Sequence, residues 1–156
     1  MTTTPSSRPE SEGDASVAPL EQVQLAKDDA PERLEARWHQ CANAKDWDAC
    51  LDVAKAITRA IPNSPFSWIR YGYASRQARR GDPHEAFEAL LPIAQKFPEH
   101  PAIAYNLACY ACQIGRLDEA REWLRQATEK GDPEQVKRMA LDDRDLDPLR
   151  TSVEAL

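Results

Sequence analysis

Two cysteines three residues apart, Cys109 and Cys112, are the residues whose type and spacing most directly suggest chemistry. A Cys-x-x-Cys pair can form a redox-active dithiol or supply half of the ligands of a zinc site. The pair lies in the segment YNLACYACQIG, which we interpret as helical, and residues at i and i+3 of a helix share a face. A disulfide is hard to form there without disturbing the backbone, and a structural zinc usually needs two such pairs.

The other two cysteines, Cys41 and Cys50, would have to complete any zinc site, but they are nine residues apart and fall on different predicted helices. Cys50 stands where small residues recur later in the chain, so we expect it to be a small buried residue. The sequence therefore favours Cys109 and Cys112 as two small thiols that line a groove. A redox or zinc role is the alternative hypothesis.

The histidines offer no clearer catalytic pattern. The segment HEAFE, residues 84–88, resembles the H-E-x-x-H motif of zinc proteases, but Glu88 replaces the second histidine ligand. The sequence contains no nucleophile elbow, no P-loop and no glycine-rich dinucleotide loop. We therefore predict a protein that is not an enzyme, with no catalytic residues, no metal and no cofactor.

The composition is that of an ordinary globular protein. The 156 residues are 42% hydrophobic and 29% charged, and the formal net charge is −6, with acidic residues concentrated towards both ends. Such ends would repel a phosphate backbone, which argues against nucleic-acid binding. The sequence shows neither a signal peptide nor an apolar run long enough to span a membrane, so we expect a cytoplasmic protein without a membrane partner.

Segment 1–28 is rich in Ser, Thr, Pro and acidic residues, and we predict that it is a disordered tail in which 17–26 could form a helix on an apolar surface. Segment 29–156 is punctuated by Ser-Pro and Asp-Pro pairs. A Ser or Asp side chain caps a helix, and a proline at the first helical position lacks the N–H that would stay unpaired. The pattern predicts no strands and helices at 31–44, 46–61, 65–80, 83–97, 101–114, 117–130, 133–140 and near 148–155.

Sequence features recur at an interval of about 34 residues. Ala86 and Leu90, for example, recur as Ala120 and Leu124. A helix–turn–helix unit of this length indicates a solenoid, because one pair of helices cannot bury its own apolar face and has to stack on the next. The small and large apolar residues expected at the helix contacts are Leu51, Ile57, Gly72, Ala86, Leu90, Ile93, Leu107, Ala108, Ala120, Leu124 and Ala127.

These motifs resemble the tetratricopeptide repeat family. The matches to its W-x-x-L-G start, second helix and closing proline are Trp68-x-x-Tyr71-Gly72, GRLDEAREWLRQA (115–127), and Pro62 with Pro98. The resemblance implies an all-α, right-handed α-solenoid of about three helix–turn–helix repeats, at 31–64, 65–100 and 101–134, with a capping helix within 135–156. Segment 139–149 is similar to the closing segment of small bacterial members, and we expect Val136, Met139 and Leu141 to form the apolar side of the cap.

In this family the first helices of the repeats line a concave groove that holds a peptide. Carried over by position, the resemblance implies a groove formed by His39, Phe66, Ile69, Arg70, Tyr73, Arg76, Tyr105, Asn106 and Cys109. Aromatic residues and arginine are the usual anchors of an interface, so we expect an apolar or amphipathic ligand with an acidic residue that meets Arg70 or Arg76. Arg76 also shares a helical face with Arg79 and Arg80, which suits either the helix dipole or an acidic partner, including the protein's own acidic tail.

The resemblance therefore implies an adaptor or scaffold that binds a peptide or helix of another protein in the groove. Two alternatives stay open: a small chaperone that holds an export substrate, and a thiol or zinc protein that uses Cys109 and Cys112. Residues 17–26 could also fill the groove, or the chain could form a homodimer. The identity of the partner, the pathway and the oligomeric state do not follow from the sequence.

Overall fold

The computed structural model describes residues 30–156, and this part of the chain is helical without strands. The longer helices are α2 (Pro31–Asn43), α3 (Trp47–Ala60), α4 (Pro65–Gln77), α5 (Pro83–Lys96), α6 (Pro101–Gln113), α7 (Leu117–Lys130) and α8 (Pro133–Asp142). A short 3-10 helix, η1 (Arg144–Leu149), and a final turn of α-helix, α9 (Arg150–Glu154), follow them. None of these helices is long and apolar enough to cross a membrane.

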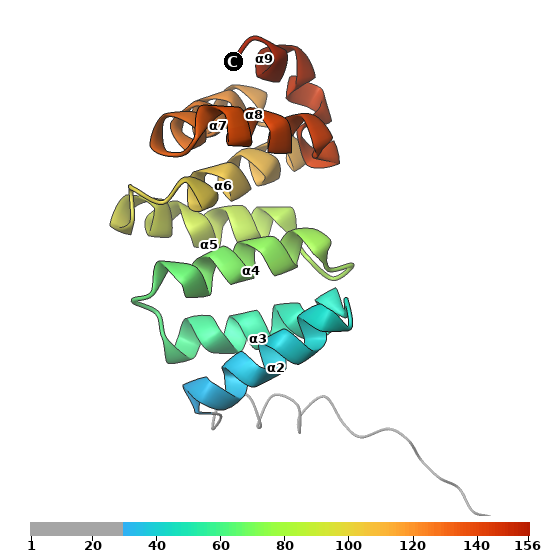
Figure 1. Cartoon of the computed structure of the whole chain (residues 1–156), viewed down its shortest axis with the longest axis vertical. Helices are drawn as coiled ribbons and strands as arrows, with labels where there is room; N and C mark the ends of the chain where they lie inside the picture. The colour runs from blue at the N-terminus through green and yellow to red at the C-terminus, as the bar shows by residue number, and fades with distance from the viewer. Residues whose placement is uncertain (1–29) are drawn as a thin grey trace, which may run out of the picture.

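The helices pack in consecutive pairs that stack along the long axis of the molecule, from α2 at one end to α9 at the other (Figure 1). Each hairpin contacts the next, so that α4 packs against α3, α5 and α6, and α6 packs against α5 and α7. The prediction of an all-α solenoid is therefore confirmed. The predicted tail 1–28, with its segment 17–26, lies outside the described residues.

Aspartate side chains cap the N-termini of three helices, as the sequence predicts. Asp46 accepts a hydrogen bond from the backbone N–H of Ala49, and Asp82 and Asp132 each accept two from the first turn of α5 and α8. Two of the caps that the Ser-Pro and Asp-Pro pairs predict are wrong: Ser64 makes no side-chain cap, and Asp147 lies inside η1 instead of capping the last helix. At Ser64 the helix start still carries a proline, so one of the unpaired N–H groups is absent there anyway.

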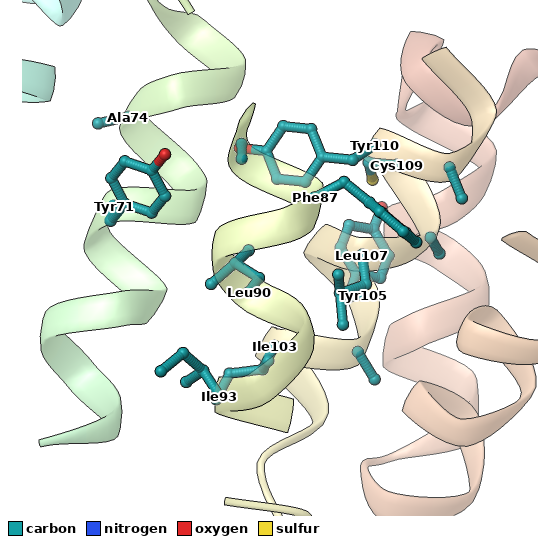
Figure 2. Packing of buried hydrophobic residues seen from close by; sticks show 14 of the residues in the cluster. Tyr71, Ala74, Phe87, Leu90, Ile93, Ile103, Tyr105, Leu107, Cys109 and Tyr110 are labelled. Atoms are coloured by element: carbon teal, nitrogen blue, oxygen red, sulfur yellow. The ribbon is translucent and has the colours of Figure 1, made fainter. Parts of the chain in front are cut away.

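The core runs continuously along the stack, and Figure 2 shows its centre, where side chains of α4, α5 and α6 meet. All the apolar residues predicted at helix contacts are buried. Helix α6 is the most enclosed element, with ten of its thirteen residues buried. A helix that is apolar on all sides must be covered on all sides, and α6 is covered by α4, α5, α7 and, from the concave side, η1.

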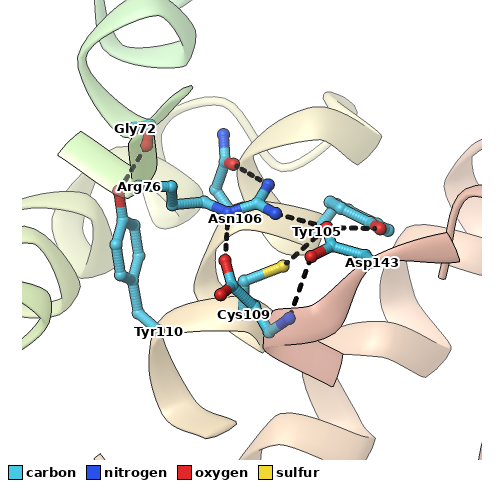
Figure 3. Close-up of polar contacts among 8 residues, drawn as sticks. Gly72, Arg76, Tyr105, Asn106, Cys109, Tyr110 and Asp143 are labelled. Atoms are coloured by element: carbon cyan, nitrogen blue, oxygen red, sulfur yellow. Dashed lines mark hydrogen bonds and ion pairs between the residues drawn. The ribbon is translucent and has the colours of Figure 1, made fainter. Parts of the chain in front are cut away.

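Gly72 marks the closest approach between α4 and α6. A Cβ atom at this position would lie 2.8 Å from Nδ2 of Asn106 and 3.2 Å from Cδ1 of Leu90, so the neighbours leave no room for a side chain. The Tyr110 hydroxyl donates a hydrogen bond to the carbonyl oxygen of Gly72 (Figure 3). The W-x-x-L-G-like motif therefore needs a glycine at position 72 because a larger side chain would collide with its neighbours, and not because the backbone conformation requires one.

The C-terminal cap differs from its prediction. Val136 is buried as expected, but Met139 is 47% exposed and Leu141 is only partly buried. The buried cap residues that the sequence analysis missed are Ala140, Leu146, Leu149 and Val153. The reason is the 3-10 helix η1, which packs against α6 and buries its two leucines, Leu146 and Leu149.

Candidate peptide-binding cleft

The first helices of the pairs and the C-terminal segment enclose a cleft of about 790 Å³. Its walls come from α2, α4, α6 and α8 and from the residues that lead into η1. The cleft is lined by Trp38, Ile69, Arg70, Tyr73, Arg76, Gln77, Ala102, Tyr105, Asn106, Met139, Asp142, Asp143, Arg144 and Asp145. The concave face is therefore bordered at one end by Trp38 of α2 and at the other by the chain's own residues 142–145.

Arg76 joins α4 to the C-terminal segment through a largely buried ion-pair network (Figure 3). Its side chain is 7% exposed, and its guanidinium pairs with Asp143 and, 3.0 Å from Nε, with Oδ2 of Asp145. It also donates a hydrogen bond of 3.2 Å to Oδ1 of Asn106, and the Tyr105 hydroxyl donates one of 3.0 Å to Asp143. Every polar group of the network thus has a partner, as buried polar groups require.

The groups of this network shift one another's pKa values in directions that keep the network intact. Burial alone would lower the pKa of Arg76, but the neighbouring acidic groups, the Cys109 thiol and the carboxylates of Asp143 and Asp145, outweigh that effect, and the pKa is raised. Burial raises the pKa of Tyr105, and Asp143 raises it further, so the hydroxyl stays protonated and can donate. Burial also raises the pKa of Cys109 well above its usual value, so at neutral pH this residue is a neutral thiol and adds no charge beside Arg76.

Arg70, at the other end of the cleft, is also held in an ion pair with a carboxylate of the same chain. Its guanidinium makes two hydrogen bonds of 2.5 Å to the carboxylate of Glu35 on α2, and it lies 5.6 Å from the ring centroid of Trp38. The hydrogen bond from Arg70 is the main reason why the pKa of Glu35 is lowered. This pair joins α2 to α4, and it leaves Arg70 with a carboxylate partner already in place.

The apolar part of the cleft has no such partner within the described residues. Tyr73 is 44% exposed, although the edge of its ring packs on Trp47 at a centroid distance of 5.3 Å. Met139, on α8, is 47% exposed, and Ile69 and Trp38 complete this surface. Exposed apolar side chains gathered in a concave site are the usual signature of a binding surface.

Six of the nine residues predicted for the groove lie in the cleft: Ile69, Arg70, Tyr73, Arg76, Tyr105 and Asn106. The structure places the other three elsewhere. His39 is exposed on α2 and bonds to Glu35 at 3.1 Å, and Phe66 is 63% exposed at the start of α4, with its ring edge-on to His100. Cys109 is fully buried, because residues 143–149 cover the part of α6 from which it projects.

The acidic residues of the cleft were not predicted from the sequence. Asp142, Asp143 and Asp145 line the concave side, where the sequence analysis expected none of these three residues. The one signal was the group Arg76, Arg79 and Arg80, for which an acidic partner was among the expectations. Arg76 pairs with Asp143 of the C-terminal segment and Arg80 pairs with Asp52 at 2.8 Å, whereas the predicted tail 1–28 lies outside the described residues.

The thiols of α6 do not favour a redox or zinc role. Cys109 and Cys112 are both buried, and burial raises the pKa of Cys112 to about 11. Cys109, Asp143 and Asp145 place three potential metal ligands within 4.8 Å of one another. The guanidinium of Arg76 already bonds to both carboxylates, however. A cation in that space would meet a fixed positive charge, so this donor set does not fit a metal ion.

The stacked hairpins and the concave cleft define the class of the protein as a helical-repeat solenoid. Residues 77–140, from the end of α4 into α8, match the family model described as tetratricopeptide repeat. This part of the chain therefore carries tetratricopeptide repeats, as its motifs indicated. Repeats of this family are in general protein–protein interaction modules and not enzymes. A search of curated proteins finds no match.

Proposed function

We propose that this protein binds an amphipathic helix or extended peptide of a partner protein in the cleft between α2, α4, α6 and α8. The observation that carries the proposal is the exposure of Tyr73 and Met139 within a concave site of about 790 Å³. Binding of an apolar face would remove both side chains from water, at about 25 cal/mol for each Å² buried. A helix laid in a groove is one of the recurring modes of peptide recognition.

The charges support an apolar ligand and not an acidic one. The acidic anchor expected from the sequence would have to displace Glu35 from Arg70, or Asp143 and Asp145 from Arg76. Each displacement would break an existing ion pair to make an equivalent one, with little net gain. The affinity must then come from apolar contacts, and for so small a cleft we expect a dissociation constant near the micromolar range, about −8 kcal/mol.

The double variant Tyr73→Ala/Met139→Ala is expected to weaken partner binding about tenfold or more, because it removes the exposed apolar surface from both walls of the cleft. To identify the ligand, a photo-crosslinking side chain would replace Gln77, which is exposed in the cleft. A synthetic peptide that spans the crosslinked segment would then be titrated calorimetrically. Tyr105 is unsuitable for this test, since it is 6% exposed and holds Asp143.

Phe66→Ala is the matched control, because it removes an exposed aromatic ring outside the cleft. Binding that is weakened equally by both variants, or by neither, would contradict the proposal. Repeating the titration with a chain that lacks residues 1–29 tests whether segment 17–26 occupies the cleft: the truncated chain would then bind the peptide more tightly. Sedimentation over a range of concentrations tests the homodimer.

A further inference from the structure

A second pair of thiols lies in the first hairpin, and its two members are on different helices, unlike Cys109 and Cys112. Cys41 on α2 and Cys50 on α3 face each other with 2.8 Å between their Sγ atoms. Cys50 is completely buried, and Cys41 is 9% exposed. The Cys50 thiol donates to the sulfur of Cys41, whose own thiol donates to the carbonyl oxygen of Trp38 at 3.2 Å.

The geometry is close to that of a disulfide. A disulfide bond is about 2.05 Å long, so the two sulfur atoms have to approach by less than about 1 Å. The two residues sit on adjacent helices of one hairpin, so rotation of the side chains can supply this movement while both helices stay in place. Within one helix, as at Cys109 and Cys112, the backbone would have to give way.

We propose that Cys41 and Cys50 are a reversible oxidation site, which hydrogen peroxide converts into an intramolecular disulfide between α2 and α3. With peroxide, Cys41 is oxidised first because it is the less completely buried member of the pair. Its thiol becomes a sulfenic acid, and peroxide is reduced to water. The Cys50 sulfur then attacks the Cys41 sulfur, the S–O bond breaks, and the departing hydroxide takes up the Cys50 proton to leave as a second water.

The buried member of the pair sets the rate of closure. Burial and the hydrogen bond to Cys41 raise the pKa of Cys50 to about 12, and the thiolate is the reactive form. Closure is therefore slow at neutral pH and faster as the pH rises. Cys50 is inert until Cys41 has been oxidised, which restricts the reaction to this pair.

The disulfide would act on a helix that makes few buried contacts with the rest of the molecule. Helix α2 buries only two side chains, Leu34 and Cys41, and it packs chiefly against α3. It also carries Trp38, which forms one wall of the cleft. A covalent link at Cys41 would suppress local opening of α2 and fix Trp38 in place. This oxidation site is independent of any ligand and stands whether or not the cleft binds a peptide.

The test exposes the full-length reduced protein to a small excess of hydrogen peroxide at pH 8 and measures its intact mass without reductant. We expect a monomer that has lost two hydrogen atoms per chain, a crosslinked peptide that joins Cys41 to Cys50, and full reversal by dithiothreitol. The variant Cys109→Ser/Cys112→Ser should react in the same way, and Cys41→Ser should not. Hydrogen exchange should slow at least tenfold across α2 in the oxidised form.

Three results would overturn the proposal. The first is a disulfide mapped to Cys109 and Cys112 in the wild-type chain. The second is a chain in which Cys41 carries added oxygen atoms or links to another molecule while Cys50 stays reduced. The third is unchanged exchange in α2 after the disulfide has formed, which would leave the link without its structural effect. Peptide mapping of the wild-type protein needs no variant, so the test does not depend on whether Cys41→Ser folds.

Discussion

Replacing Arg76 with alanine is expected to lower the free energy of unfolding by about 2–4 kcal/mol, a large share of the stability of a domain of this size. The variant leaves Asp143 and Asp145 without their cation, in a site where their side chains are only 17% and 28% exposed. An uncompensated charge in such a site is costly, and breaking a fully buried pair costs about 3–5 kcal/mol. Urea denaturation followed by circular dichroism measures the loss.

Arg80→Ala is the matched control. Arg80 follows the same helix and also pairs with two aspartates, Asp48 and Asp52, but its side chain is 57% exposed. Exposed pairs contribute about 0–1 kcal/mol, so this variant should unfold almost like the wild type. Equal losses for Arg76→Ala and Arg80→Ala would mean that the network at the end of the cleft does not hold the C-terminal segment in place.

A triple variant separates the cost of unpaired charge from the loss of packing. Arg76→Met with Asp143→Asn and Asp145→Asn removes all the formal charges of the network and keeps most of the volume. Replacing a complete buried network is often much less costly than removing one member. The triple variant should therefore be more stable than Arg76→Met alone, and the opposite order would contradict the assignment of the loss to unpaired carboxylates.

The elements that local chemistry specifies were predictable from the sequence. Helices such as α5 and α8 begin after an aspartate and with a proline, and these two residues act within a single turn. Of the groove residues that the resemblance implied on α4, only Phe66 lies outside the cleft. The others share one face, as side chains three and four positions apart do on a helix. Ile69, Tyr73 and Arg76 accordingly line the cleft together.

What the sequence could not reveal depends on contacts between distant segments. Asp143 meets Arg76 across 67 positions of the chain, and no local pattern in LDDRDLDPL indicates that this segment folds back over α6. The burial of Cys109 follows from that fold-back and was missed with it. The contact between Cys41 and Cys50 was missed for a related reason. A separation of nine residues does not predict that two side chains touch unless the packing of α2 on α3 is known.

Replacing Phe87 with alanine is expected to have an even larger effect, a loss of about 3–5 kcal/mol. Phe87 is completely buried in α5, at the centre of the stack, and Figure 2 shows it among the core residues contributed by α5 and α6. The guanidinium of Arg116 also lies 5.2 Å from its ring centroid. Removing the ring loses its transfer free energy and leaves a cavity that neighbouring helices, fixed by their own contacts, cannot fill.

Replacing Phe66, whose ring is 63% exposed, with alanine should change the free energy of unfolding by less than about 1 kcal/mol. In a solenoid each hairpin is stabilised by its neighbours. Damage at α5 should therefore weaken the link between α2–α3 on one side and α6–α9 on the other. Hydrogen exchange in Phe87→Ala is then expected to rise more in α3 and α4 than in α7. A uniform rise across all helices would indicate one indivisible core instead of stacked hairpins.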